Sequence, residues 1–322
     1  MRIGQVGVGP WGRNLARNFD DLADLAWLCD VDAETRQDLV ARYPRAAVTA
    51  DFDELLADPK LDAIVIATPV PTHFDLARRG LAAGKHVFVE KPPAMRSAEI
   101  DELVSLSEEH DLVLMPGHLL LYHPGVQKLK GLIDAGTLGD VLYTYGNRQN
   151  FGVIRTVENA LWSLGVHDLS VILYLLDEEP EEAIAVGRDF LTGGVEDVVF
   201  CYLRFPSGKI AHMHLSWLDP HKIRRMTVVG NEKMAVFDDM ELERKVTIYE
   251  KWTEEPGGTY GEWRTRTGDI FSPKIANDEP LRLECEHFLR LVAGEGDRRK
   301  VARDGAMVVR TLERLEESLR GR

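Results

Sequence analysis

The sequence predicts two domains of different class. A doubly wound α/β domain is expected over residues 1–120, and an α+β domain with a large, mostly antiparallel open β-sheet is expected over residues 121–322. Three observations support this division. Short apolar runs alternate with amphipathic helical patterns through the first 120 residues. A glycine-rich turn joins the first strand to the first helix, and after residue 120 strand-like runs follow one another mostly without helices between them.

The composition is that of an acidic globular protein. The 322 residues are 44% hydrophobic and 29% charged, and the formal net charge is −14. An acidic chain without a concentrated basic patch is a poor candidate for binding nucleic acid or an anionic membrane surface. No apolar run reaches the length of a membrane span, and no leader-like segment precedes the first strand, so we expect a cytoplasmic protein with neither kind of partner.

The segment RIGQVGVGPWGRNLARNF near the start of the chain is typical of a nucleotide-binding turn. Three glycines with the spacing G-x-G-x-x-G lie between an apolar strand and a helical pattern. Glycines at these places allow a tight turn and close approach of the backbone to a pyrophosphate, which the helix N-terminus also attracts. A glycine turn without a ligand is the alternative. The expected cofactor contacts here are Gly7, Gly9, Pro10, Trp11 and Gly12.

Asp30 ends the next apolar run, LAWLCD, about 20 positions after the glycine turn. A carboxylate at this place accepts hydrogen bonds from the ribose hydroxyls of adenosine and repels a 2′-phosphate. Asp32 adds negative charge, and no arginine directly follows Asp30. The sequence therefore favours NAD over NADP as the cofactor.

Two further polar stretches follow strand-like runs. Thr68, Pro69 and His73 follow LDAIVIA, and Glu90 and Lys91 follow HVFV. Ligands of doubly wound sheets lie beyond the carboxyl ends of the strands, so all five residues are candidates for cofactor contact. A lysine beside a nicotinamide can take a hydroxyl proton or polarise a carbonyl, and Glu90 can orient it. Taken alone, however, Glu90-Lys91 is more simply a surface ion pair at a strand end.

Longer patterns decide between these alternatives. TP-x-x-x-H, followed by A-x-x-G-L-x-A-G-K-H-V-x-x-E-K-P, resembles the glucose–fructose oxidoreductase / inositol dehydrogenase / MocA family of NAD(P)-dependent oxidoreductases. The resemblance extends over most of the chain and implies a Rossmann domain, an open-sheet domain and activity on sugars, cyclitols or related alcohols. It implies a catalytic or substrate-orienting role for Lys91. His167 matches the histidine of the family's D-x-x-x-H pattern, but Ser163 replaces the aspartate.

The second half contains the expected substrate residues and the remaining elements. A helix is expected over residues 121–135, a buried helix after His167, and two amphipathic helices near the end of the chain. Asp168 is expected to cap the buried helix or to support its neighbours. An irregular segment before His167 suits a diphosphate or carboxylate ligand and equally suits ordinary loop charge. The candidate substrate contacts are His118, Tyr122, Arg148, Asn150, Arg155 and Ser163.

Assembly and metal binding follow from the same strands. An open sheet face exposes more apolar surface than a monomer usually does, so a homodimer or homotetramer through the second-domain sheet is expected. His212 and His214 share a strand face. No acidic residue or cysteine lies on that local face, so a polar stripe is the simpler explanation and no metal site is predicted.

The leading functional hypothesis is an NAD-dependent oxidoreductase that transfers hydride to or from a ring carbinol, at C3 of a nucleotide-linked sugar. His167 or Lys91 would take the proton. The resemblance to the nucleotide-sugar branch of the family implies this substrate class. A free-sugar or cyclitol dehydrogenase is the first alternative. A non-catalytic NAD-binding sensor or scaffold is the second, because Ser163 replaces the family aspartate.

Overall fold

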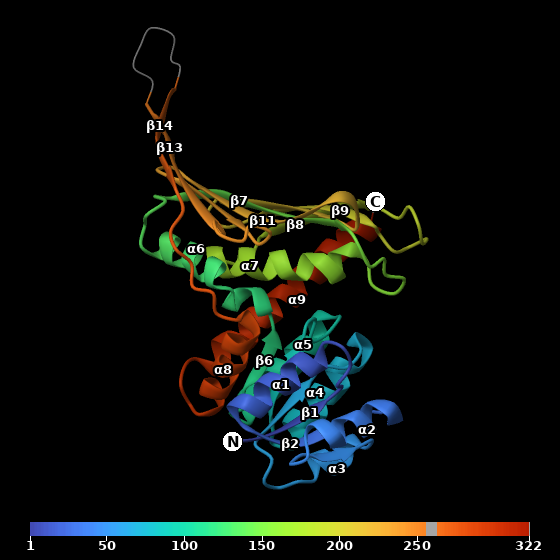
Figure 1. Cartoon of the computed structure of the whole chain (residues 1–322). Helices are drawn as coiled ribbons and strands as arrows, with labels where there is room; N and C mark the ends of the chain where they lie inside the picture. The colour runs from blue at the N-terminus through green and yellow to red at the C-terminus, as the bar shows by residue number, and fades with distance from the viewer. Residues whose placement is uncertain (256–262, 322) are drawn as a thin grey trace. The chain divides into compact units, whose positions relative to one another are not determined.

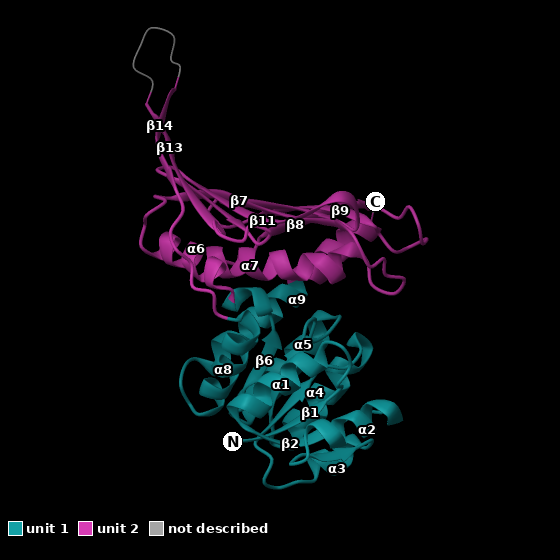
Figure 2. Ribbon diagram, viewed as in Figure 1, with its two compact units in different colours: residues 1–122, 279–310 teal, residues 123–278, 311–322 magenta. Residues whose placement is uncertain are grey.

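The chain forms two compact units in the computed structural model, which describes residues 1–255 and 263–321 (Figure 2). The first unit consists of Met1–Tyr122 and Glu279–Arg310, and the second of His123–Asp278 and Thr311–Arg322. The sequence predicted one division after residue 120. The units agree with that point of division to within two residues, but a later segment of the chain returns to the first unit.

The first unit contains a six-stranded sheet in the order β3-β2-β1-β4-β5-β6. Every neighbouring pair is parallel, and the strand order reverses between β1 and β4, as a doubly wound fold requires. The predicted fold class of this half is confirmed. The strands are β1 (Arg2–Val6), β2 (Asp24–Cys29), β3 (Ala47–Thr49), β4 (Ala63–Ile66), β5 (His86–Glu90) and β6 (Leu114–Gly117).

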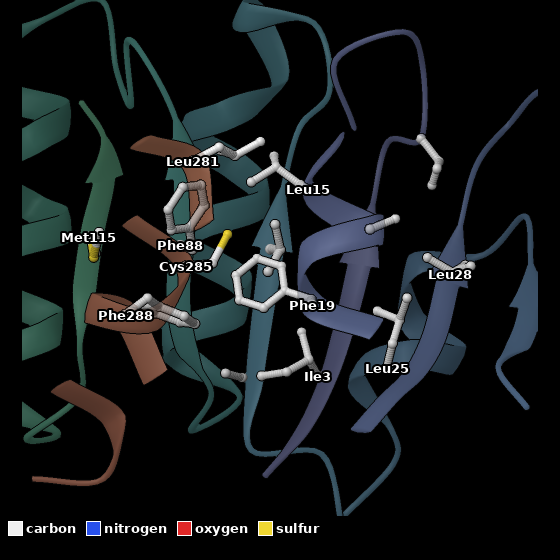
Figure 3. Packing of buried hydrophobic residues seen from close by; sticks show 14 of the residues in the cluster. Ile3, Leu15, Phe19, Leu25, Leu28, Phe88, Met115, Leu281, Cys285 and Phe288 are labelled. Atoms are coloured by element: carbon white, nitrogen blue, oxygen red, sulfur yellow. The ribbon is translucent and has the colours of Figure 1, made fainter. Parts of the chain in front are cut away.

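Helices connect these strands and complete the unit's core. Helix α8 comes from the later segment, and its Phe288 packs edge-to-face against Phe19 of α1 and Phe88 of β5 (Figure 3). This cluster fixes α8 to the sheet. The helical elements are α1 (Gly12–Leu22), α2 (Ala33–Arg42), α3 (Phe52–Leu56), η1 (Val70–Thr72), α4 (His73–Ala82), α5 (Ser97–Glu109), η2 (Leu119–Tyr122), α8 (Pro280–Val292) and the first part of α9 (Arg298–Arg320).

The second unit contains an eight-stranded sheet in the order β14-β13-β12-β11-β7-β10-β9-β8. Only the β7–β10 pair is parallel, so the expected mostly antiparallel sheet is confirmed. The sequence did not predict β14, whose residues are all exposed and carry little apolar alternation. The strands are β7 (Val141–Phe151), β8 (Glu182–Arg188), β9 (Val198–Arg204), β10 (Ile210–Ser216), β11 (Leu218–Gly230), β12 (Met234–Asp238), β13 (Val246–Glu254) and β14 (Arg264–Phe271).

Helices α6 (Pro124–Asp134) and α7 (Val166–Leu176) lie along one face of this sheet (Figure 1). The sequence predicted one helix over residues 121–135, but the structure divides it into η2 and α6. His123 caps α6 by accepting a hydrogen bond at Nδ1 from the Gly125 amide (2.9 Å). Proline at the first helical position fixes the new start.

The opposite face of the sheet carries aromatic and apolar side chains. Tyr145 stacks on His212 with ring centroids 4.9 Å apart, and Phe200 stacks on His214 at 4.4 Å. The two histidines therefore belong to an aromatic surface. Exposed residues of the same face include Tyr143, Val186, Phe200 and Ile210. Among the described residues, no helix combines the length and apolarity that crossing a bilayer requires.

Candidate active site

The glycine turn has the geometry of a diphosphate-binding loop. Gly7 has a φ of 83°, and a Cβ there would lie 2.5 Å from the carbonyl oxygen of Ala67. A Cβ at Gly12 would collide with the carbonyl oxygen of Gly7. A Cβ at Gly9 would meet nothing within 4 Å, so the middle glycine borders open space before the N-terminus of α1. The loop therefore fits the phosphates of a dinucleotide.

Gln5 holds this turn in place, a role that the sequence analysis missed. Its side chain is fully buried in β1, and its Nε2 donates to the carbonyl oxygens of Gly7 (2.9 Å) and Gly12 (2.8 Å). One amide thus ties both ends of the turn together. The available signal was a lone polar residue inside an apolar strand, because a buried amide needs partners.

Asp30 lies beside the same turn, at the end of β2. Its carboxylate accepts hydrogen bonds from the backbone amides of Val8 (2.7 Å) and Asp32 (2.9 Å). A carboxylate has about four acceptor sites, so capacity remains for ribose hydroxyls. Asp32 caps α2 through the Thr35 amide. Arg36 donates to the backbone carbonyl of Asp30 at 2.9 Å, so a guanidinium is closer to this site than the spacing along the chain suggested.

His73 joins two of the strand-end loops. It is buried, and its Nδ1 lies 2.8 Å from the carbonyl oxygen of Pro92 while its Nε2 lies 2.8 Å from that of Thr68. Thr68 in turn shares a hydrogen bond with Thr72. This placement differs from the expected direct cofactor contact. It indicates that His73 holds the Thr68-Pro69 loop against the loop after Lys91.

Glu90 is buried at the end of β5, which contradicts a surface ion pair. Its Oε1 accepts a hydrogen bond from the indole nitrogen of Trp11 (2.5 Å), and its Oε2 lies 3.2 Å from the Lys91 amide. Burial raises the pKa of Glu90, while the Trp11 hydrogen bond and the charge of Lys91 oppose that rise. The EKP segment is thereby attached to the glycine turn, and Lys91 follows directly at the strand end.

His118 and Tyr122 follow β6, the next strand of the sheet. Burial, with a smaller contribution from the charge of Lys91, lowers the pKa of His118 to about 4. Its imidazole is therefore neutral at pH 7, and Lys91 lies close enough to act on it electrostatically. Tyr122 packs against His287 of α8, with ring centroids 5.4 Å apart.

His167 lies at the start of α7 in the second unit. A π-helical turn (Leu161–Gly165, labelled η3) precedes it, so the residues from Ser163 to His167 do not form one regular α-helical turn. His167 is half-buried, whereas Val166 and Asp168 beside it are buried. Ser163 is also buried. The π turn is a local irregularity of the kind often found at functional sites.

Arg148 and Asp168 form a buried ion pair. The guanidinium donates from Nε (2.9 Å) and Nη2 (2.7 Å) to Asp168 Oδ1, and both residues are at most 4% exposed. A Cβ at Gly146 would lie 3.0 Å from the Asp168 carboxylate, so a glycine makes room for the pair. The pair joins β7 to α7 next to His167. This differs from the expected substrate contact of Arg148 and from a capping role for Asp168.

The other candidates of this unit lie nearer solvent. Asn150 is half-buried near the end of β7, and Arg155 is exposed in the irregular segment that follows. Arg155 lies 3.5 Å from Glu158. The two arginines that the sequence grouped therefore have different environments, and Arg155 alone is exposed.

Known proteins match this architecture along the whole chain. Residues 1–118 match an oxidoreductase family with an NAD-binding Rossmann fold, and residues 126–236 match the GFO/IDH/MocA C-terminal domain. The UDP-N-acetylglucosamine 3-dehydrogenase of Acidithiobacillus ferrooxidans is 30% identical over 313 residues, which cover 97% of this chain and 94% of that protein. A solved structure of that enzyme has a TM-score of 0.84 at 28% identity and covers 100% of this chain and 98% of its own.

Two further proteins are similar to the chain, one by sequence and one by structure. The inositol 2-dehydrogenase of Acidothermus cellulolyticus is 27% identical over 288 residues, which cover 86% of this chain and 83% of that protein. GenD2 from gentamicin A biosynthesis, solved in complex with NAD, has a TM-score of 0.81 at 25% identity and covers 100% of this chain and 95% of its own. The family predicted from the glycine and EKP patterns is confirmed: the chain belongs to the GFO/IDH/MocA family of oxidoreductases with an NAD-binding Rossmann domain.

Proposed function

We propose that this enzyme is an NAD-dependent dehydrogenase that acts at ring carbon C3 of a nucleotide-linked sugar of the UDP-N-acetylglucosamine class. The observation that carries the proposal is the match to UDP-N-acetylglucosamine 3-dehydrogenase over 97% of the chain. The glycine turn and Asp30 support the choice of cofactor, because together they offer a diphosphate cradle and a ribose acceptor. NAD is preferred over NADP on the charge of Asp30.

The chemistry requires that the sugar carbinol lose a hydride and a proton to become a ketone. Bound NAD supplies the hydride acceptor. In this proposal the chain itself positions the sugar and takes the hydroxyl proton, and the candidate acceptors are the Lys91 amine and the His167 imidazole. Ser163 hydrogen-bonds but does not carry charge as an aspartate would, so the acid–base work falls on those two residues.

The proposed substrate contacts keep the residues that the sequence assigned to this role. His118, whose imidazole is neutral, would contact the sugar together with Tyr122. Asn150 and Ser163 are the other proposed sugar contacts. Arg155 is the proposed partner of a substrate phosphate, because its guanidinium is exposed. Arg148 would act indirectly, by holding α7 through Asp168.

A cyclitol or free-sugar dehydrogenase is the second candidate. One observation favours it: the buried Arg148–Asp168 pair leaves a single exposed arginine of the expected two for a diphosphate. The inositol 2-dehydrogenase match over 86% of the chain supports the same reading.

A panel of alcohols separates these candidates. We would incubate the enzyme with NAD and, in turn, UDP-N-acetylglucosamine, other UDP- and dTDP-sugars, free sugars and inositol, and follow NADH absorbance. Reduction with UDP-sugars alone supports the leading proposal, and reduction with inositol or free sugars alone supports the second. If the protein binds NAD but none of these alcohols reduces it, the result supports a non-catalytic sensor or scaffold. The same assay with NADP tests the cofactor preference.

The aromatic face of the second-unit sheet supports a homodimer or homotetramer. Tyr143, Phe200 and Ile210 are 36%, 49% and 39% exposed, and together they make an apolar surface on a sheet that its own helices cover on the other side (Figure 1). Light scattering at micromolar concentration tests this, and a monomer there would contradict it. A cytoplasmic location stays a prediction.

A further inference from the structure

Glu284 of α8 is a buried carboxyl group to which the proposed mechanism gives no role. It is 0% exposed, and neither of its carboxyl oxygens has a hydrogen-bond partner among the described residues. A buried, unpartnered carboxylate is strongly disfavoured, because the charge loses its hydration without compensation. Such a residue lowers stability unless it keeps its proton, so its presence needs a functional explanation.

Glu284 lies alongside Glu90, and the packing of two phenylalanines shows why. Phe88 and Phe288 pack edge-to-face, with centroids 5.7 Å apart. Glu90 is two residues after Phe88 on the same face of β5, and Glu284 is one helical turn before Phe288 on α8. In Figure 3, Leu281 lies nearer than Phe288 to the carboxyl end of β5, so α8 runs antiparallel to β5. The two carboxyl groups thus lie at the same end of the Phe88–Phe288 contact.

Among the residues that the structure describes, few positive charges act on the pair. Lys91 acts on Glu90, and the Trp11 indole donates to it. On α8, Cys285 is a buried thiol beside both carboxyl groups. Arg17 of α1 is paired with Glu279 at the surface, and His118 after β6 is neutral. Gly117 of β6 leaves room for the Glu90 carboxyl, because a Cβ there would lie 3.2 Å from it.

We propose that the buried carboxyl groups of Glu90 and Glu284 together retain one proton next to the cofactor loop, and that binding of the oxidised, cationic nicotinamide releases this proton to solvent. In this proposal Glu284 is a positioning residue that acts through the charge of Glu90. The proposal uses the NAD binding of the family and is independent of which sugar the enzyme oxidises. The proton leaves a carboxylic O–H as the positive ring arrives, so charge is balanced. Reduced nicotinamide is uncharged and leaves the proton in place.

Electrostatics gives the direction of the effect. Burial and the charge of Glu90 raise the pKa of Glu284 well above the ordinary glutamate value, and burial also raises the pKa of Glu90. Two such groups titrate in two steps that belong to the pair. A cation at the strand end favours the ionised pair, so affinity for NAD⁺ relative to NADH rises with pH through the upper step.

The test compares the wild type with Glu284→Gln, which keeps the shape of the side chain and cannot ionise. We would measure dissociation constants of NAD⁺ and NADH by fluorescence and calorimetry across pH 6–9. In the wild type, the NAD⁺/NADH affinity ratio should rise by about threefold to tenfold per pH unit through the upper step, because one proton is exchanged. In Glu284→Gln this rise should disappear, and proton release on NAD⁺ binding should fall.

Glu286→Gln is the matched control, since Glu286 lies on the same helix and pairs with Arg282 at 3.2 Å. It should behave as the wild type. Glu284→Met is the second variant if glutamine disturbs folding, and it should also remove the pH dependence. An unchanged ratio profile in both Glu284 variants would overturn the proposal, as would a failure of either cofactor form to bind.

Stability supplies a readout that needs no cofactor and no substrate. Because folding raises the pKa of Glu284, folding must add a proton at neutral pH, and stability falls as pH rises from the ordinary glutamate pKa toward the raised one. Glu284→Gln should therefore unfold about 2–4 °C higher than the wild type above neutral pH, with little difference near pH 4. A lower midpoint for the variant at all pH values would contradict a protonated Glu284.

Discussion

The glycine turn of the first unit and the N-terminus of α7 in the second unit hold their polar groups in place by different means. In the glycine turn, glycines allow the backbone conformation of the loop. Gln5 and Asp30 stabilise that loop through hydrogen bonds to its main-chain groups. In the second, a π turn and the buried Arg148–Asp168 pair hold α7 and hence His167. The difference teaches that the first site depends on local conformation, and the second on one long-range electrostatic contact.

The largest expected effect is the loss of stability on breaking the buried Arg148–Asp168 ion pair of the second unit. Asp168→Ala should lower the free energy of unfolding by about 3–5 kcal/mol, because it leaves the Arg148 guanidinium buried without a partner. Chemical denaturation measures this. Glu158→Ala is the control, because it removes the carboxylate that pairs with the exposed Arg155. It should lower the free energy of unfolding by at most about 1 kcal/mol. Equal losses in the two variants would show that the buried pair does not hold α7.

The next effect separates chemistry from cofactor binding. Lys91→Ala and His167→Ala should each reduce turnover by about 10²-fold or more, because each removes a candidate proton acceptor. NAD affinity, measured by fluorescence, should change little in His167→Ala. Lys60→Ala replaces an exposed lysine and should match the wild type. Full turnover in both active-site variants would refute the assignment of the proton acceptor.

The glycine turn allows a sharper dissection within the first unit. Gly12→Ala should lower stability by about 1–3 kcal/mol, since its Cβ would collide with the Gly7 carbonyl. Gly9→Ala should leave stability nearly unchanged but weaken NAD binding, since its Cβ would point into open space that the phosphates would use. Thermal unfolding and NAD titration together distinguish the two. Unimpaired NAD binding by Gly9→Ala would show that this loop does not bind the diphosphate of NAD.

The smallest effect concerns pH. Folding lowers the pKa of His118 to about 4, so the unfolded chain binds a proton that the folded chain does not between about pH 6.5 and pH 4. Stability contributed by neutral His118 is therefore present above pH 6.5 and is lost as the pH falls through that window. In His118→Asn, the free energy of unfolding, measured by denaturation at each pH, should fall by about 1–2 kcal/mol less than in the wild type across this pH window. A wild-type slope retained in the variant would assign the limb to other groups.

The two regions also differ in what the sequence could predict. The glycine turn, Asp30 and the strand-end positions followed from spacing, because tight turns and parallel strands leave local patterns. The dipeptide Glu90-Lys91 by itself favoured a surface ion pair, but Glu90 is buried and accepts a hydrogen bond from Trp11, 79 residues earlier. No local pattern encodes such a contact.

In the second unit, local patterns predicted the elements better than the roles. The buried helix after His167 was expected, but the π turn before it was not, since i→i+5 bonding has no distinct apolar period. Arg148 was assigned to the substrate because it lies with Arg155 in an irregular segment before His167 that suits a diphosphate or carboxylate ligand. Its partner Asp168 lies 20 residues later and was predicted to cap the buried helix or to support its neighbours. Long-range pairing of charges decides such roles, and one sequence does not reveal it.

The central claim is that the cofactor site of the first unit receives hydride from C3 of a nucleotide-linked sugar. The most direct measurement uses UDP-N-acetylglucosamine carrying deuterium at C3, with NAD and the wild-type enzyme, followed by mass spectrometry of the reduced nicotinamide. We expect deuterium in the nicotinamide ring and a slower hydride-transfer step than with the unlabelled sugar. Reduced nicotinamide without deuterium, or no reduction of NAD by this sugar while inositol reduces it, would contradict the account.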